Sequence, residues 1–271
     1  MRLASEQKAA EAEEVLPAVF AGSPELSARL KSMLSRDAAP GALAKRDSVG
    51  HASILFFSLD GDPGEDDLEC LRDAGKARVP VICLRAGTGR GPLPGVLATS
   101  IVSVSADGEL PIAQIGHLVC RLLDGRSVAL AASLPALRPS ICGELIHRSA
   151  RRSAFVGATS FIPAPDLPAL FLEQARLILR LGQAHGRRLE PARAGELAAV
   201  LAAGLTMRRL ARRTRSSRIP GWAVQGSIAY AGTLALGEAA LLYFAAAHGD
   251  SDSGAETPIE ASQPPEMPSA A

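Results

Sequence analysis

Aromatic residues make up only 4% of this 271-residue chain, although 47% of it is hydrophobic. The apolar content is therefore mostly Ala, Leu and Val, a composition that suits closely packed helices. An excess of charge of either sign is also missing, since the formal net charge is +1. Without a strong positive field, the chain as a whole is not expected to bind nucleic acid.

Paired cysteines and an apolar leader are absent as well. The N-terminus contains EQKAAEAEE, which is polar and acidic where a signal peptide needs an apolar stretch. We therefore expect that the chain is not secreted. The cysteines show no CxxC pair, and we expect them to be buried thiols of a reducing compartment: Cys70, Cys83, Cys120 and Cys142.

Familiar catalytic motifs are also missing. The chain contains no HExxH, no GxSxG and no Gly-Lys-Ser/Thr, and its five histidines lack metal-ligand spacing. The segment from Asp60 to Gly64 imitates the start of a calcium loop, but Glu65 and Leu71 stand where Gly and a bidentate Glu belong. The sequence therefore offers no candidate for a catalytic, cofactor-binding or metal-binding residue. We expect that the protein is not an enzyme.

The chain divides into two unlike parts. Residues 15–125 alternate strand and helix signals, whereas residues 126–247 are rich in Ala, Leu and Arg and lose the strand signals. Residues 1–14 are a charged lead-in. Residues 248–271 carry five acids with several Pro and Ser, and we expect this acidic tail to be disordered.

The first part is predicted to be a small three-layer α/β domain. After the apolar run from Val15 to Ala21, Ser23 can cap a helix that has Pro24 at its first position. Continuous apolar runs between turn signals predict buried strands, which argues for a parallel sheet covered on both faces. The expected elements are strands 53–60, 79–84 and 101–105 and helices 25–35, 65–76 and 110–124.

From residue 53 to 124, the order of features resembles the second half of a small GTPase-like domain. Strand 53–60 ends in an acidic loop, and strand 79–84 stands where the family leads to its guanine-reading motif. Strand 101–105 ends in Ser105-Ala106, similar to the family's strand that ends in Ser-Ala beside the base. The phosphate chemistry departs from the family, because the equivalent turn has Pro24 and Glu25 instead of glycines and a lysine. The resemblance therefore implies a degenerate GTPase-like domain.

The second part is predicted to be all-α, with helical stretches near 138–152, 166–183, 190–214 and 222–247. Its segment 224–247 has 24 residues and one charge. At about 1.5 Å per residue it would reach roughly 36 Å, enough to cross a hydrocarbon core of about 30 Å. Two interpretations stay open for this segment: a membrane-spanning helix or a buried helix of a soluble bundle.

Small residues recur every four positions along this segment, from Ser227 through Ala231 and Ala235 to Ala239. We expect this stripe, with Gly237 and Glu238, to pack closely against another helix. Glu238 opposes a spanning helix, because a carboxylate near the bilayer centre costs about 2.5–3.5 kcal/mol on insertion scales.

A cluster of six arginines within eleven residues precedes the apolar segment. Such a cluster suits anionic lipid headgroups, or an acidic protein, and would keep its side of the membrane cytoplasmic. No aromatic residues alternate with these arginines, so nucleic acid is not the expected partner. The predicted membrane or anion contacts are Arg208, Arg209, Arg212, Arg213, Arg215 and Arg218.

A second basic run, 147–152, precedes an apolar stretch that extends from Ala154 to Leu172. Three prolines and Asp166 interrupt this stretch, so we do not expect one straight span. We expect a broken or re-entrant segment, or a pair of helices that forms a membrane hairpin.

An ordered set of Pro, Gly and Gln landmarks runs through residues 148–247. It includes Arg152-Ser-Ala-Phe-Val-Gly157, Ile162-Pro-Ala-Pro-Asp166 and Ile219-Pro-Gly221, followed by Ile228-Ala-Tyr-Ala-Gly-Thr233. This region resembles the bacterial YcjF-like domain of unknown function. The resemblance implies a membrane-associated domain that often follows a GTPase domain, and it supplies no catalytic residue.

Together these features predict a non-catalytic scaffold or adaptor, in the cytoplasm or on the cytoplasmic side of a bacterial inner membrane. The expected partners are anionic lipid or another protein such as a GTPase, with self-association through the helical part. Two other classes stay open. One is a nucleotide-responsive protein with an unorthodox site near Gly22, Asp60 and Ser105, and the other is a soluble helical module that binds lipid or protein in a groove.

Overall fold

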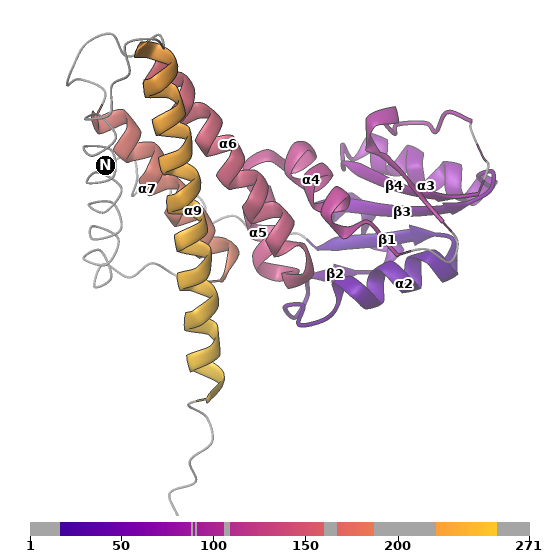
Figure 1. Ribbon diagram of the computed structural model, residues 1–271. Coiled ribbons are helices and arrows are strands. Elements are labelled where there is room, and N and C mark those ends of the chain that lie inside the picture. Colours follow the sequence, from indigo (N-terminus) through magenta and orange to yellow (C-terminus); the bar gives the residue numbers. More distant parts are fainter. Residues whose placement is uncertain are drawn as a thin grey trace, which may run out of the picture.

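The computed structural model describes residues 17–87, 89, 91–105, 109–159, 167–186 and 221–253. A five-stranded parallel sheet with its helices is followed by a group of long helices (Figure 1). The predicted class, α/β plus helical, is therefore confirmed. The predicted lead-in 1–14 and helix 190–214 lie outside the described residues, as does the tail beyond residue 253.

All strand pairs of the sheet are parallel, in the order β2-β1-β3-β4-β5. This is the order of flavodoxin-like doubly wound sheets, in which the connections diverge to opposite faces at a switch point. Here the switch point lies between β1 and β3. The order does not establish the GTPase-like resemblance, which stays a prediction. The strands are β1 (Ala18–Gly22), β2 (Leu43–Ala44), β3 (Ile54–Asp60), β4 (Val81–Ala86) and β5 (Ile101–Val104).

Helices cover both faces of the sheet, as the continuous apolar strands predict. Helices α2 (Pro24–Leu34) and α4 (Ile112–Leu123) pack on one face, with Ile54 and Phe56 of β3. Helix α3 (Glu65–Lys76) and the 3-10 turn η1 (Arg46–His51) pack on the other, with Leu55 and Phe57. Because β3 supplies apolar side chains to both cores, it is hydrophobic at successive positions instead of alternating.

Besides the 3-10 turns, one strand and one α-helix are too short to have been predicted. Strand β2 has two residues and joins the sheet only by pairing with β1. Helix α5 (Ser127–Ser133) has seven residues and follows Asp124, whose φ is +43°. Elements this short carry no readable hydrophobic period, so only their tertiary contacts reveal them.

Three long helices form the second part: α6 (Arg138–Thr159), α7 (Leu167–Ala184) and α9 (Gly221–Ser253). Helix α6 extends from α4, beside the sheet, to the far end of the molecule, where it packs against α9 (Figure 1). The stretch 154–172, predicted to be broken, is divided between α6 and α7, and residues 160–166 lie outside the described part. Helix α9 continues six residues beyond the predicted end at 247.

One hydrophobic core crosses the change of composition at residue 125. It starts on the α2–α4 face of the sheet and continues through α5 into the three long helices, with members such as Ile115, Leu137, Ile146 and Leu236. A backbone hydrogen bond from Ala39 N to Ser133 O, 2.9 Å long, joins the two parts at their junction.

Candidate functional site

Helix α9 buries one narrow stripe, mostly against α6 and, at Phe244, against His185 after α7. Small residues bring the two backbones close: a Cβ on Gly157 would lie 2.9 Å from the Cβ of Ala229, and one on Gly226 would lie 3.2 Å from Ala154 O. The spacing of three and four residues is the one that places side chains on a single helix face. The stripe comprises Gly226, Ala229, Thr233, Leu236, Gly237, Ala240 and Phe244.

The opposite side of α9 remains open, and apart from Ser227 and Glu238 it is apolar. Leu242 is 73% exposed, and exposed alanines stand at 231, 235, 239, 245 and 246. Only 33% of the apolar window within Ala223–Ala246 is buried. In the described part of the chain, this is the one helix that is long and apolar enough to cross a membrane by length and composition.

The structure separates the predicted helix-packing residues. Gly237 lies in the contact with α6, whereas Ser227, Ala231, Ala235 and Glu238 are exposed. Ser227 Oγ donates to Ala223 O at 2.8 Å, a bond within the helix itself. Within this chain the close contact therefore uses a neighbouring stripe of the same helix, and pairing of the exposed stripe with a second helix stays a prediction. The predicted membrane contacts Arg208, Arg209, Arg212, Arg213, Arg215 and Arg218 lie outside the described residues.

The carboxyl ends of the strands gather Gly22, Asp60 and Ser105 at one edge of the sheet. In doubly wound sheets this edge, beside the switch point, is where ligands bind. Ser23 N donates to Ser58 O at 2.7 Å, so that N–H is not available to a phosphate. Ser23 stands at the N-cap position as predicted, but its hydroxyl makes no capping hydrogen bond.

The basic loop after β4 is held by its own arginine. Arg85 is 8% exposed, and its guanidinium donates to Gly89 O at 3.0 Å and to Gly91 O at 2.9 Å. This cation is therefore engaged with backbone carbonyls. The neighbouring loop after β3 contributes Asp60 and Asp62, whose charges disfavour a bound phosphate.

All four cysteines are buried and free. Burial raises the pKa of Cys83 and of Cys120 to about 11, and that of Cys142 to about 12. Burial also raises the pKa of Cys70. The thiolate is the nucleophile and the metal ligand, and the raised pKa values of these thiols disfavour it at neutral pH.

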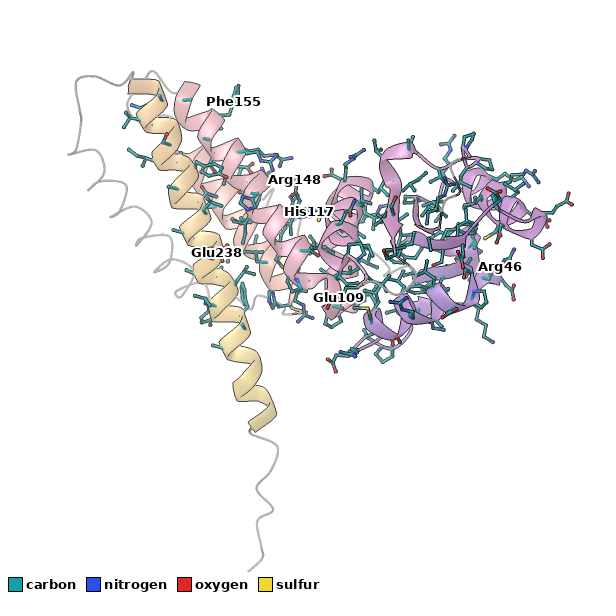
Figure 2. The ribbon with its side chains drawn as sticks, turned by 45° about the vertical axis from the view of Figure 1, so that its right-hand side comes forward. Arg46, Glu109, His117, Arg148, Phe155 and Glu238 are labelled. Atoms are coloured by element: carbon teal, nitrogen blue, oxygen red, sulfur yellow. The ribbon has the colours of Figure 1, made fainter. Side chains whose placement is uncertain are left out.

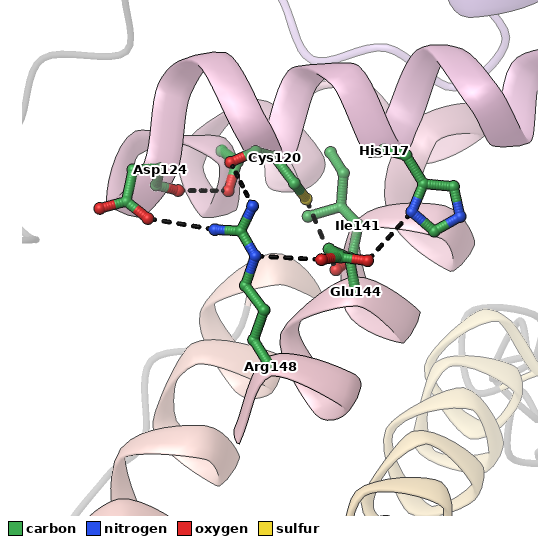
Figure 3. A network of polar contacts seen from close by, with 7 residues as sticks. His117, Cys120, Asp124, Ile141, Glu144 and Arg148 are labelled. Atoms are coloured by element: carbon green, nitrogen blue, oxygen red, sulfur yellow. Dashed lines mark hydrogen bonds and ion pairs between the residues drawn. The ribbon is translucent and has the colours of Figure 1, made fainter. Parts of the chain in front are cut away.

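A polar network joins α4 to α6 (Figure 3). Arg148 lies at its centre: its Nε donates to Glu144 Oε1 at 3.1 Å, and its two terminal nitrogens donate to Asp124 Oδ1 and Cys120 O, each at 3.2 Å. His117 Nδ1 lies 3.1 Å from Glu144 Oε2. The network covers the C-terminal end of α4, where a cation is favoured by the helix dipole.

The charge of Glu144 follows from this network. Burial alone would raise the pKa of Glu144, but the hydrogen bond and charge of Arg148, with the contact from His117, lower it below its usual value. Glu144 and Arg148 are four residues apart on one helix, a spacing that could have suggested their pairing from sequence. The described residues contain no group of three or more His, Cys, Asp or Glu placed to hold a metal ion.

Comparison of the chain with protein-family models, with curated proteins and with solved structures finds no match. The YcjF-like and GTPase-like resemblances therefore stay predictions, and the function has to be argued from the geometry of the chain itself.

Proposed function

We propose that this protein is a non-catalytic scaffold that associates with a membrane surface through the open side of α9. The observation that carries the proposal is the unequal burial of this helix: between Ala223 and Ala246 Glu238 is its one charged residue, yet it is packed on one side only. An apolar strip left open on a soluble domain is typical of a membrane or protein contact.

The packing of α9 on α6 defines how such a contact would form. Helix α6 exposes the charged Arg151 and Arg152 close to Phe155, which is 71% exposed, so α6 does not suit the interior of a hydrocarbon environment. While α9 stays packed on α6, its outer side can meet the membrane but lipid cannot surround it. The exposed arginines of α6 suit anionic headgroups, to which the arginines of 208–218 would add.

The sheet supports the non-catalytic part of the proposal. Its carboxyl edge has an acidic loop, an arginine engaged with its own loop and a turn whose Ser23 N–H is already bonded. None of these features favours a nucleotide phosphate. We propose that the α/β part acts as a binding platform for a protein partner, of which a GTPase is the example implied by the YcjF-like resemblance.

Vesicle flotation tests the membrane contact. The full chain is mixed with vesicles of phosphatidylcholine, with or without phosphatidylglycerol, and the floated fraction is measured. We expect binding to the anionic vesicles. The double variant A239E/L242E, which charges the open side of α9, should reduce binding at least about tenfold, because charged groups do not enter the apolar boundary.

The matched control is A28E/S32E, which adds the same charge at exposed positions of α2. It should change vesicle binding less than about twofold, since surface charges away from the contact are screened. Equal losses in the two variants would remove α9 from the contact, and a wild-type chain that never floats would sink the proposal. Release by high salt alone would exclude a spanning helix, and a micromolar GTP or ATP complex in calorimetry would contradict the non-catalytic part.

A further inference from the structure

Four arginines line a small hollow between α6 and α7. Arg148 and Arg152 lie four residues apart on α6, and Arg176 and Arg180 have the same spacing on α7. Side chains at this spacing share a helix face, so both pairs converge on the space between the helices. Figure 2 places Arg148 about midway along α6. The hollow measures about 30 Å³, with Leu145 and Leu177 also in its wall.

Positive charge exceeds negative charge around this hollow. Arg148 is paired with Glu144 and Asp124, and Arg176 Nη1 lies 3.1 Å from Glu173 Oε1. Within the described residues, neither Arg152 nor Arg180 has a hydrogen bond or an ion pair, and both are exposed at the mouth. Four guanidinium groups thus face three carboxylates, Glu144 included. The two arginines at the mouth are positioned to bind an incoming anion.

A buried hydroxyl adds a second observation. Ser149 is 8% exposed and lines the hollow, and its Oγ has no hydrogen-bond partner in the described part of the chain. On the same helix Ser140 Oγ donates to Leu137 O at 2.9 Å, whereas Ser153 Oγ also lacks a partner but does not line the hollow. A buried hydroxyl without such a bond is a donor available to a ligand.

We propose that this hollow binds a phosphate group, as a phosphate monoester dianion or inorganic phosphate. Guanidinium forks match the oxygens of a tetrahedral phosphate, which accepts several charge-assisted hydrogen bonds at once. Arg152 and Arg180 contact the phosphate from the mouth, Arg148 and Arg176 line the wall, and Ser149 Oγ donates from the interior. The proposal does not depend on the membrane contact of α9, because a free phosphate compound and a lipid with a terminal phosphate present the same group.

Calorimetric titration of the full chain with inorganic phosphate, at constant ionic strength set by chloride, tests the site. We expect saturable binding. The variant R152Q/R180Q should weaken it at least about tenfold, because both unpaired cations are lost. R151Q removes an exposed arginine of α6 that does not line the hollow, and it should change the affinity less than about twofold. Both changes affect exposed side chains, so folding is expected to survive.

S149A provides a readout that a purely structural role would not give. Removing an unpartnered buried hydroxyl should leave the stability of the free protein unchanged or higher, while phosphate binding weakens several-fold.

A vesicle experiment identifies the source of the phosphate group. Binding to phosphatidylcholine vesicles that contain phosphatidic acid is compared with binding to vesicles in which phosphatidylglycerol supplies the same charge. A preference for phosphatidic acid that R152Q/R180Q abolishes supports the site and assigns a lipid phosphate.

Saturable binding of inorganic phosphate without that preference supports the site and assigns a free phosphate compound. Two results would overturn the proposal. One is the absence of any saturable phosphate effect in both arms. The other is an equal loss of affinity in R151Q and R152Q/R180Q, which would indicate only general electrostatic attraction. Neither result depends on whether A239E/L242E changes vesicle binding.

Discussion

Gly237 of α9 lies against the side chain of Ile146 of α6, so closely that a Cβ built on Gly237 would come within 2.6 Å of Ile146 Cγ1. The contact lies in the middle of the helix pair that leaves the outer side of α9 open. Glycine here serves the close approach of the two helices, because the helical backbone itself does not require it.

The close contact predicts opposite effects for two glycine substitutions on the same helix. G237A should lower the free energy of unfolding by about 1–3 kcal/mol, because the added methyl group overpacks Ile146. G232A, where an added Cβ meets nothing within 4 Å, should raise it by up to about 1 kcal/mol through helix propensity. Denaturant unfolding of the full chain measures both. In an I146A background the penalty of G237A should disappear, and its persistence there would contradict this packing.

The network around Glu144 predicts a loss of stability in acid. The pKa of Glu144 is lowered in the folded state, so the unfolded state binds its proton more readily. The contribution is therefore fully present above the unfolded pKa of about 4.3 and is lost as the pH falls through the folded value.

E144Q tests this pH dependence. It should destabilise the protein by about 1–3 kcal/mol at neutral pH, since Arg148 loses a charged acceptor. It should also flatten the acid limb of the stability profile. E109Q, at an exposed position, is the control and should keep the wild-type profile. Superimposable pH profiles for wild type and E144Q would show that the network does not contribute.

The turn after β1 predicts that alanine destabilises the protein more at Gly22 than at Gly41. Gly22 has φ +93°, and a Cβ there would lie 1.9 Å from Ser58 O, a backbone atom that cannot move aside. G22A should cost at least about 3 kcal/mol, from the sum of backbone strain and overlap with β3. Gly41 has φ +79° but open space around it, so G41A should cost only about 1–2 kcal/mol. Thermal unfolding of both variants measures the two losses of stability. Equal losses in G22A and G41A would show that the overlap with Ser58 O is relieved.

The thiols provide a fourth prediction. With burial raising the pKa of Cys83, Cys120 and Cys142 to about 11, about 11 and about 12, the folded protein should react with an aromatic disulfide reagent only at the rate of its opening. All four cysteines should react once denaturant is added. A thiol that reacts within mixing time in the folded chain at mildly alkaline pH would disprove the buried placement.

Local signals were sufficient for most of the elements. Strand β3 and helix α3 lie within one residue of their predicted bounds, because a continuous apolar run and an acidic first turn are properties of neighbouring residues. The same local character explains the prediction of a parallel sheet covered on both faces. Strand β4 is shifted to Val81–Ala86, since its end is decided by pairing with β3 and not by its own composition.

The amino-acid sequence by itself determined that α9 is long, apolar and nearly uncharged, and that arginine is the cation of the helical part. Only the tertiary structure decided which stripe of α9 is buried. The predicted stripe at Ser227, Ala231 and Ala235 and the buried one at Ala229 and Thr233 are both small, so composition cannot choose between them. Which stripe is buried depends on the shape of α6, where Ile146 and Gly157 contact α9.

The convergence of Arg148 and Arg152 with Arg176 and Arg180 has the same origin. Each pair is visible on its own helix, but the hollow exists only because α6 and α7 pack side by side. A sequence pattern shows which side chains share a helix face, whereas contacts between helices follow from the shapes of both partners and the connections that join them.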